Sequence, residues 1–356
     1  MAWRRPGVQI PAGPLLKGDF MKTYAEAGVD IDKKDVFLNN LLREIKYKKR
    51  GFNLGTGIGH YSSLIRFGEY YLALNTDGVG TKMLIADELG KWDTVGIDAI
   101  AMNVNDTICV GAEPFAFLDY LIIRDYNIKK AREIGKSLNR GAAEAGVTIV
   151  GGETAVMPDM VNGTDLSGTS IGYVSIGKEI TGKKIRRNDV IVGLESSGLH
   201  SNGFTLVRKL IKENNISYDE RIGNSKLSNI LLKPTRLYVK TVLDVIKNVD
   251  VHGIAHITGG GLRNLIRLSK KLFIINDPIK PQRIFTYIAD LGDIDPLEMY
   301  QTFNMGMGMA LIIPEDQSKE TIEISIKNGI GAKIVGYVEN GFGVSVPEFN
   351  IFYDRY

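Results

Sequence analysis

Three carboxylates in the first half of the chain stand where they could act together. Asp77 and Glu153 each come at the end of an apolar, strand-like run, and Asp106 lies in a helix-like segment. Mg²⁺ takes a few carboxylates together with waters and phosphates as its ligands. We therefore predict a Mg²⁺ site made by Asp77, Asp106 and Glu153. The alternative for Asp77 is a plain Asp-Gly turn that closes a strand.

Two glycine-rich segments flank the first of these strands. Asp77 is followed by Gly78-Val79-Gly80-Thr81-Lys82, where bare amides can face phosphate oxygens and Lys82 can neutralise them. The other segment is Gly55-Thr56-Gly57-Ile58-Gly59. Its spacing differs from the G-x-G-x-x-G dinucleotide fingerprint, and Gly80-Thr81-Lys82 inverts the end of the G-x-x-x-x-G-K-[ST] phosphate loop. The common nucleotide motifs therefore do not explain these glycines.

The segment over residues 94–110 predicts a helix with two distinct faces. Its apolar arc holds Ile97, Ile100, Ala101, Val104 and Ile108. The opposite arc holds Asp98, Met102, Asn105 and Asp106. That arc has no Lys, Arg or Glu, and Asp and Asn are weak helix formers. A face that departs from local preference indicates function, and an ordinary solvated face is the alternative.

Side-chain donors are dense where a strand-like run meets a helix-like run in the second half. The donors are Ser197, His200, Ser201 and Asn202. A helix-capping loop is the alternative. His252 and His256 lie four residues apart on a strand-like segment and would share a face, but no third zinc ligand follows. We prefer the interpretation that one of these two is a core histidine and the other a site histidine.

Three glycines precede a helix-like segment that starts at Leu262. These are Gly259, Gly260 and Gly261. Exposed amides at a helix N-terminus bind anions, so we predict an anion site here. A flexible turn between strand and helix is the alternative.

Helices and strands alternate along the chain. We expect helices over residues 32–50, 94–110, 128–145, 202–214, 228–248, 262–271 and 315–328. We expect strands over residues 63–67, 70–75, 114–123, 147–150, 170–176, 190–195, 251–257, 310–313 and 333–338. This order predicts an α+β fold of two α/β-type domains, residues 21–182 and 183–356. Prolines interrupt residues 1–20, which we interpret as a leader or a segment added to the natural chain.

Composition narrows the class of protein. The 356 residues carry a formal net charge of +3, which argues against nucleic acid as the main partner. No run of about 18 apolar residues predicts a membrane helix, so no membrane association is expected. A single cysteine excludes an intramolecular disulfide framework and favours a cytoplasmic location. We interpret that residue, Cys109, as a structural thiol.

The chain resembles the phosphoribosylformylglycinamidine cyclo-ligase family, also called aminoimidazole ribonucleotide synthetases. The resemblance covers nearly all of residues 24–340. It is carried by YAEAGVDID (24–32), TDGVGTK (76–82), DTVGIDAIAMNVND (93–106), GAEPFAFLDY (111–120), GGETAVMP (151–158), SSGLHSNGFTLVRK (196–209), PTRLYVK (234–240), HITGGG (256–261) and YQTFNMGMGM (300–309). The glycine loop GTGIGH is shorter and less glycine-dense than is usual in the family.

The resemblance implies a fold and a reaction. The first domain would be ferredoxin-like and would pair with its copy in a homodimer to form a β-barrel, and the second would be a mixed sheet with helices. ATP would phosphorylate the formyl amide oxygen of formylglycinamidine ribonucleotide. The amidine nitrogen would then attack that carbon, giving aminoimidazole ribonucleotide, ADP and phosphate.

That chemistry implies roles for the candidate residues. ATP would be bound by Lys46, Gly55, Gly57, Gly59, Lys82 and Asn105, and Mg²⁺ by the three carboxylates. The catalytic residues would be Asp106, His200 and His256. The substrate would be bound by Ser197, Ser201, Asn202, Gly259, Gly260 and Gly261, with the three glycines taking its phosphate.

Other readings belong to the same superfamily or to another class. The chain also resembles other enzymes of that superfamily: thiamine-phosphate kinase, selenide-water dikinase, the hydrogenase maturation dehydratase and the larger formylglycinamide amidotransferase. The dikinase uses a Cys or selenocysteine near its N-terminal glycine loop, and this chain has no Cys before Cys109. A nucleotide-binding dimer without catalytic activity is the alternative from a different class.

Overall fold

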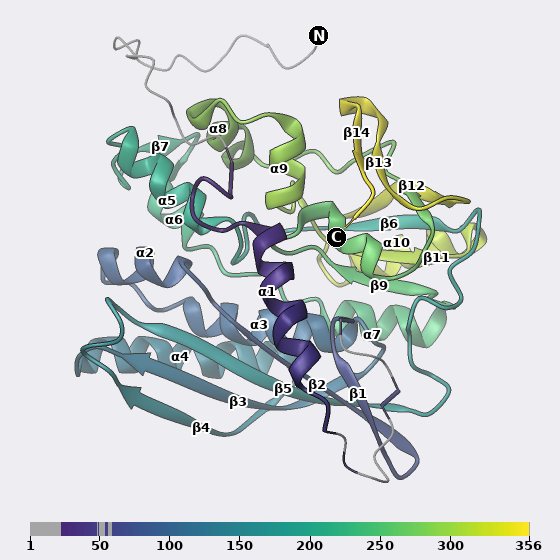
Figure 1. The fold of residues 1–356 in the computed structure, drawn as a ribbon, viewed down its shortest axis with the longest axis horizontal. Coiled ribbons are helices and arrows are strands. Elements are labelled where there is room, and N and C mark those ends of the chain that lie inside the picture. The colour runs from purple at the N-terminus through teal and green to yellow at the C-terminus, as the bar shows by residue number, and fades with distance from the viewer. Residues whose placement is uncertain (1–22, 48, 50–53, 56–58, 356) are drawn as a thin grey trace.

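A computed structural model describes residues 23–47, 49, 54–55 and 59–355. The described elements form two domains, each built on one sheet with helices packed against it (Figure 1). The expected leader over residues 1–20 and the predicted ATP ligand Gly57 lie outside the described residues.

The first domain contains a five-stranded sheet in the order β1-β2-β5-β3-β4. Its strands are β1 (Ser63–Phe67), β2 (Tyr70–Gly78), β3 (Glu113–Ile123), β4 (Thr148–Val156) and β5 (Asp165–Ser175). Its helices are α2 (Lys82–Leu89), α3 (Val95–Ile108) and α4 (Ile128–Ala145). Strands β3 and β4 are parallel, joined through α4, and the other neighbours are antiparallel.

The helices of this domain lie on one face of the sheet (Figure 1). Helix α3 contacts β2, β3 and β5 and is buried along nearly its whole length. The chain order β2-α2-α3-β3-α4-β4-β5 differs from the β-α-β-β-α-β order of a simple ferredoxin-like unit. The first domain therefore agrees with the ferredoxin-like expectation only in having a sheet with helices on one face.

The second domain contains a seven-stranded mixed sheet in the order β14-β13-β10-β12-β6-β11-β9. Its strands are β6 (Val190–Glu195), β9 (Gly253–His256), β10 (Leu272–Ile274), β11 (Met307–Ile313), β12 (Ala332–Glu339), β13 (Gly343–Val346) and β14 (Ile351–Tyr353). A separate hairpin pairs β7 (Arg221–Ile222) with β8 (Ser225–Lys226). Central strands β6 and β11 are almost entirely buried, which explains their continuous apolar sequence.

Helices and 3-10 turns cover this second sheet. They are α5 (Phe204–Glu213), α6 (Leu227–Leu231), α7 (Val239–Asn248), η1 (Gly261–Arg267), α8 (Arg283–Gly292), α9 (Pro296–Thr302), η2 (Glu315–Gln317), α10 (Ser318–Lys327) and η3 (Pro347–Phe349). The segment expected to be an α-helix over 262–271 is a short 3-10 helix, and its first glycine has a φ of 52°.

Helix α1 (Ile31–Glu44) crosses in front of both domains (Figure 1). Asp30 caps it by accepting from the Lys33 N–H. Its apolar residues Phe37 and Leu41 and the C-cap residue Ile45 are exposed, 69%, 49% and 57% respectively. This helix therefore adds little to the core of the chain that carries it.

Within the described residues, no helix combines the length and the apolar character that crossing a membrane requires.

Candidate active site

An Asp–His pair lies where the two domains meet. Asp106 is on α3, and His256 ends β9 in the second domain. His256 Nδ1 lies 2.8 Å from Asp106 Oδ1. Because a carboxylate only accepts, the proton lies on Nδ1 and the imidazole is oriented by Asp106. His256 Nε2 is buried and has no hydrogen-bond partner among the described residues.

Asp77 lies near this pair on β2. Its backbone N–H donates to Asn103 of α3, and its carboxylate accepts from the Gly78 N–H. Desolvation and the neighbouring Asp106 carboxylate raise the pKa of Asp77 to about 6. Its side chain still reaches solvent, although protein surrounds most of it. Two carboxylates that repel each other in this way suit a divalent cation.

Glu153 does not join the other two carboxylates within one chain. Strand β4 continues through Glu153 to Val156, so this residue is not past the strand as expected. The register across β3 and β5 places Asp77 level with Gly152, so Glu153 points to the opposite face. Three strand spacings, about 14 Å, separate β4 from β2. In the described part of the chain, no three His, Cys, Asp or Glu side chains are grouped to hold a metal ion.

Two residues that the sequence analysis did not select also lie near Asp106. Burial and the Arg267 guanidinium lower the pKa of His60 to about 4, and the Asp106 carboxylate opposes the shift. Arg267 lies 4.4 Å above the Tyr61 ring and donates to the carbonyls of Gly59 and His60. One signal was available in the sequence, because His60 directly follows the glycine loop and is one of only 4 histidines.

Lys82 is buried where the two domains meet. Its ammonium is fully buried, 2.9 Å from Asp98 Oδ2, and donates to the backbone carbonyls of His200 and Lys233. Burial lowers its pKa, and the Asp98 carboxylate opposes the shift. The structure places Lys82 in an ion pair of the first domain, at its boundary with the second, and its phosphate contact stays an untested prediction.

Asn105 is also occupied by contacts between the domains. Its Nδ2 donates to the Arg236 carbonyl at 2.9 Å, and its Oδ1 accepts from the Tyr238 N–H at 3.0 Å. The residue is fully buried. Asn105 of the polar arc of α3 thus contacts the second domain.

His200 is buried in the loop after β6. Its Nε2 accepts from the Ser197 N–H at 3.1 Å, which places the ring proton on Nδ1. Burial holds the pKa of His200 well below its usual value, with His256 and Lys82 adding to the effect, so the ring is neutral. Its Nδ1 is buried without a partner among the described residues. His200 therefore offers one N–H donor.

The predicted substrate residues divide into two groups. Asn202 and Gly259 lie together, because a Cβ on Gly259 would be 3.0 Å from Asn202 Oδ1. Ser201 Oγ instead contacts Asp98 and Thr235, and Ser197 Oγ donates to the Pro234 carbonyl.

The other two predicted substrate glycines, Gly260 and Gly261, are buried. A Cβ on Gly261 would meet the Tyr300 carbonyl at 1.9 Å, so close backbone packing requires this glycine. The helix that follows is a seven-residue 3-10 helix, a weaker anion site than the expected α-helix.

The other predicted ATP ligands are less enclosed. Lys46 is exposed. A Cβ on Gly55 would lie 2.7 Å from the Tyr71 ring, which explains a glycine there by packing. Gly59 has a φ of 116°, and a Cβ added there would meet no atom of the described residues within 4 Å. Its carbonyl is held by Arg267 of η1, which brings the end of the glycine loop to the Asp106 region.

His252 and Cys109 have structural surroundings. His252 Nδ1 lies 2.7 Å from Asp189, and its Nε2 lies 3.3 Å from Asp250. Burial raises the pKa of the Cys109 thiol well above its usual value, so it is not a nucleophile.

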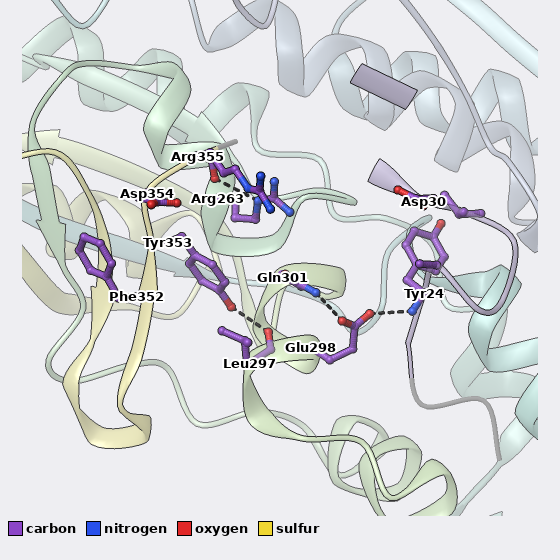
Figure 2. Close-up of a pocket in the computed structure, with 12 residues that line it drawn as sticks. Tyr24, Asp30, Arg263, Leu297, Glu298, Gln301, Phe352, Tyr353, Asp354 and Arg355 are labelled. Carbon is purple, nitrogen blue, oxygen red and sulfur yellow. Dashed lines mark hydrogen bonds between the residues drawn. The ribbon is translucent and has the colours of Figure 1, made fainter. Parts of the chain in front are cut away.

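A separate cavity of about 360 Å³ opens between the N-terminal segment, η1, α9 and β14 (Figure 2). Glu298 accepts from the Tyr24 N–H at 2.6 Å and from Thr302 Oγ1. Tyr353 donates to the Leu297 carbonyl. None of its twelve lining residues is a predicted site residue. The hydrogen bond between Tyr24 and Glu298 joins the segment that precedes α1 to the second domain. Desolvation raises the pKa of Asp77, and Lys34, on α1, opposes that shift.

Comparison with known families matches both domains. The model "AIR synthase related protein, N-terminal domain" matches residues 59–174, and "AIR synthase related protein, C-terminal domain" matches residues 186–347.

Curated relatives extend the match to nearly the whole chain. Phosphoribosylformylglycinamidine cyclo-ligase of Methanosarcina mazei is 48% identical over 90% of this chain and 96% of its own length. The protein of the same name from Pyrococcus furiosus is 47% identical over 91% of this chain and 99% of its own. The chain belongs to the phosphoribosylformylglycinamidine cyclo-ligase family, whose members are ATP-dependent ligases of purine biosynthesis.

Solved structures share the fold at lower identity. The HypE–HypF complex has a TM-score of 0.64 at 17% identity, covering 90% of this chain and 98% of that one. AaThiL complexed with AMPPCP and TMP has a TM-score of 0.63 at 18% identity, covering 90% and 94%. These likenesses support the fold.

Proposed function

We propose that the Asp106–His256 pair is the catalytic centre of the family's ring closure, the conversion of formylglycinamidine ribonucleotide and ATP to aminoimidazole ribonucleotide, ADP and phosphate. The observation that carries this proposal is the orientation of His256, whose Nδ1 is fixed by Asp106 and whose Nε2 has no partner among the residues that the structure describes.

In the first step the γ-phosphoryl group of ATP moves to the formyl amide oxygen, and ADP leaves. The amidine nitrogen then attacks the formyl carbon, a C–N bond forms, and the C–O bond breaks as phosphate departs. His256 Nε2 accepts the proton that this nitrogen loses, with Asp106 stabilising the imidazolium. His200 Nδ1–H donates to the oxygen on which negative charge develops.

The nucleotide and its cation are part of the same proposal. Asp77 and Asp106 fit a Mg²⁺ that takes its remaining ligands from ATP phosphates and water, because two carboxylates with phosphates is a set that Mg²⁺ accepts. When bound, Mg²⁺ neutralises charge on the transferring phosphoryl group. Gly59, Lys46 and His60 would lie on the ATP side, and Asn202 and Gly259 would meet the substrate.

A homodimer is proposed from the uncovered face of the first sheet. Tyr70, Phe115 and Tyr173 form an aromatic cluster there, with ring centroids 5.6 and 5.9 Å apart for the two pairs that include Tyr173. Pairing of two such faces into a barrel would bury this cluster. Glu153 points to the same face, so any ligand role for it would be toward a partner chain.

The function is tested by ADP release from the purified protein with ATP and Mg²⁺, with and without formylglycinamidine ribonucleotide. The expected result is release that depends on that substrate, with an equal amount of aminoimidazole ribonucleotide. Nucleotide binding without substrate-dependent release would instead support the non-catalytic dimer, and release with thiamine phosphate would support a kinase.

A further inference from the structure

A fully buried ion pair lies between the two domains. Lys82 is the first residue of α2, and Asp98 lies in the first turn of α3. Both side chains are 0% exposed, and Lys82 Nζ lies 2.9 Å from Asp98 Oδ2 and 3.0 Å from Oδ1. A charge pair removed from water needs close geometry and further hydrogen bonds to offset desolvation.

Those further hydrogen bonds come from the second domain. Lys82 Nζ donates to the Lys233 carbonyl at 2.7 Å and to the His200 carbonyl at 3.2 Å. With Asp98 these give each of its three N–H groups an acceptor. Asp98 Oδ1 accepts from the N–H and Oγ1 of Thr235, each at 2.7 Å, and from Ser201 Oγ at 3.1 Å.

The loop that this ion pair contacts has an unfavourable backbone conformation at His200. His200 has a φ of 61°, in the left-handed region that residues other than glycine rarely adopt. Its carbonyl is bound by Lys82 and the next side chain, Ser201, by Asp98. The His200 carbonyl and the side chain of the next residue are thus held by the first domain.

We propose that Lys82 and Asp98 are positioning residues that hold the His200 loop, so that His200 keeps its proton on Nδ1, and that Lys82 contacts no phosphate. This inference rests on the proposed role of His200 in ring closure. It also explains why a lysine follows Asp77 so closely in the sequence: the turn after Asp77 leads into α2, whose first residue is Lys82.

A lysine that binds phosphate and a lysine that positions a loop respond differently to substitution. Lys82→Met is expected to lower kcat about 100-fold, because the donor is misplaced, while the Kd of a non-hydrolysable ATP analogue changes less than about threefold. Lys82→Arg is expected to behave like Lys82→Met, because the larger guanidinium would have to displace the close partners that surround the buried ammonium. A phosphate contact would instead raise that Kd at least tenfold in Lys82→Met and be largely restored by arginine, which would overturn the proposal.

The matched control is a second buried lysine with an aspartate partner. Lys130 is 7% exposed, lies 3.4 Å from Asp87 and donates to Thr164, all within the first domain. Lys130→Met is expected to lower the melting temperature comparably and leave kcat within about twofold. Thr235→Val serves if Lys82→Met fails to fold, because it removes one donor to Asp98 and leaves the charges paired. It is expected to lower kcat about tenfold and to lower the melting temperature less than Lys82→Met does.

Histidine spectroscopy reads the position of His200 without turnover. The chain has 4 histidines, so ring-¹⁵N labelling gives four patterns, and His200→Gln identifies the one of interest. We expect the neutral Nδ1–H pattern for His200 in the wild type and in Lys130→Met, and its loss in Lys82→Met or Thr235→Val. An unchanged His200 pattern in folded Lys82→Met would overturn the positioning role. Normal turnover in His200→Gln would instead overturn the function proposed for His200, while the spectra still decide the positioning.

Discussion

In His256 and His200, opposite ring nitrogens are left without a hydrogen-bond partner among the described residues. Asp106 holds the His256 proton on Nδ1, which leaves Nε2 as an acceptor, and the Ser197 N–H occupies His200 Nε2, which leaves Nδ1–H as a donor. Ring closure needs one group that takes a proton from nitrogen and one that donates to oxygen. The two side chains are therefore complementary in the chemistry they offer.

Asp106→Asn should lower kcat about 10³-fold, because the amide no longer fixes the His256 tautomer or stabilises its imidazolium. The Kd of an ATP analogue without Mg²⁺ should stay within a few fold. Steady-state formation of aminoimidazole ribonucleotide and a binding titration measure the two effects. Asp219→Asn, at an exposed carboxylate of the second domain, is the control. Full turnover in Asp106→Asn would remove this pair from the mechanism.

Mg²⁺ dependence should change with pH because the pKa of Asp77 is raised to about 6. Below that pH a proton competes with the cation, so apparent Mg²⁺ affinity should fall about tenfold per pH unit. The free energy of unfolding changes with pH in the opposite direction to that caused by a salt-bridged carboxylate. The folded form holds its proton between about pH 4 and 6, so without metal stability decreases as pH rises through this range. Asp77→Asn should abolish both effects, and a metal affinity that stays constant from pH 7 to 5 would contradict them.

Gly308→Ala should destabilise the second domain and impair turnover. An added Cβ would lie 2.0 Å from the Tyr238 hydroxyl and 2.6 Å from His200 Cε1, both in buried side chains. Overpacking of this kind costs about 1–3 kcal/mol. Gly135→Ala in α4 is the control, since nothing lies within 4 Å and alanine should stabilise the helix by about 0.5–1 kcal/mol. Chemical denaturation measures the stability of both variants. A Gly308→Ala variant as stable as the wild type would show that the His200 pocket has spare room.

Tyr173→Asp should convert a homodimer to a monomer, because the uncovered aromatic cluster would then carry a charge at its centre. Sedimentation velocity at micromolar concentration measures the change. Ile326→Asp replaces a side chain 59% exposed on α10 of the other domain and should leave the assembly intact. A wild-type chain that sediments as a monomer would exclude the proposed barrel.

Local sequence patterns predicted the elements whose signal is local. Strands β1 and β6 have the predicted bounds, because short apolar runs between turn residues specify them. Helix α2 was not predicted, because it is short and four of its eight residues, including Lys82, are buried, so it lacks an amphipathic period. The polar face of α3 was identified correctly as unusual.

What the polar residues contact could not be predicted from sequence. The partners of Asp98 in the second domain lie 103 and 137 residues further along the chain. Glu153 was assigned to the metal because its strand was expected to end earlier. Its distance from Asp77 and its opposite face follow from the strand order and pleat of the whole sheet. Such relationships have no local signature.

The buried ion pair has a consequence for exchanging parts between relatives. A chimera that joined the first domain of one protein to the second domain of another would bring together halves of a network selected separately. Lys82 and Asp98 would stay paired because both come from the first domain, but a side-chain donor missing at residue 201 or 235 would leave the buried Asp98 carboxylate with fewer hydrogen bonds. Exchange of the second domain should therefore succeed where the incoming domain also supplies side-chain donors at positions 201 and 235.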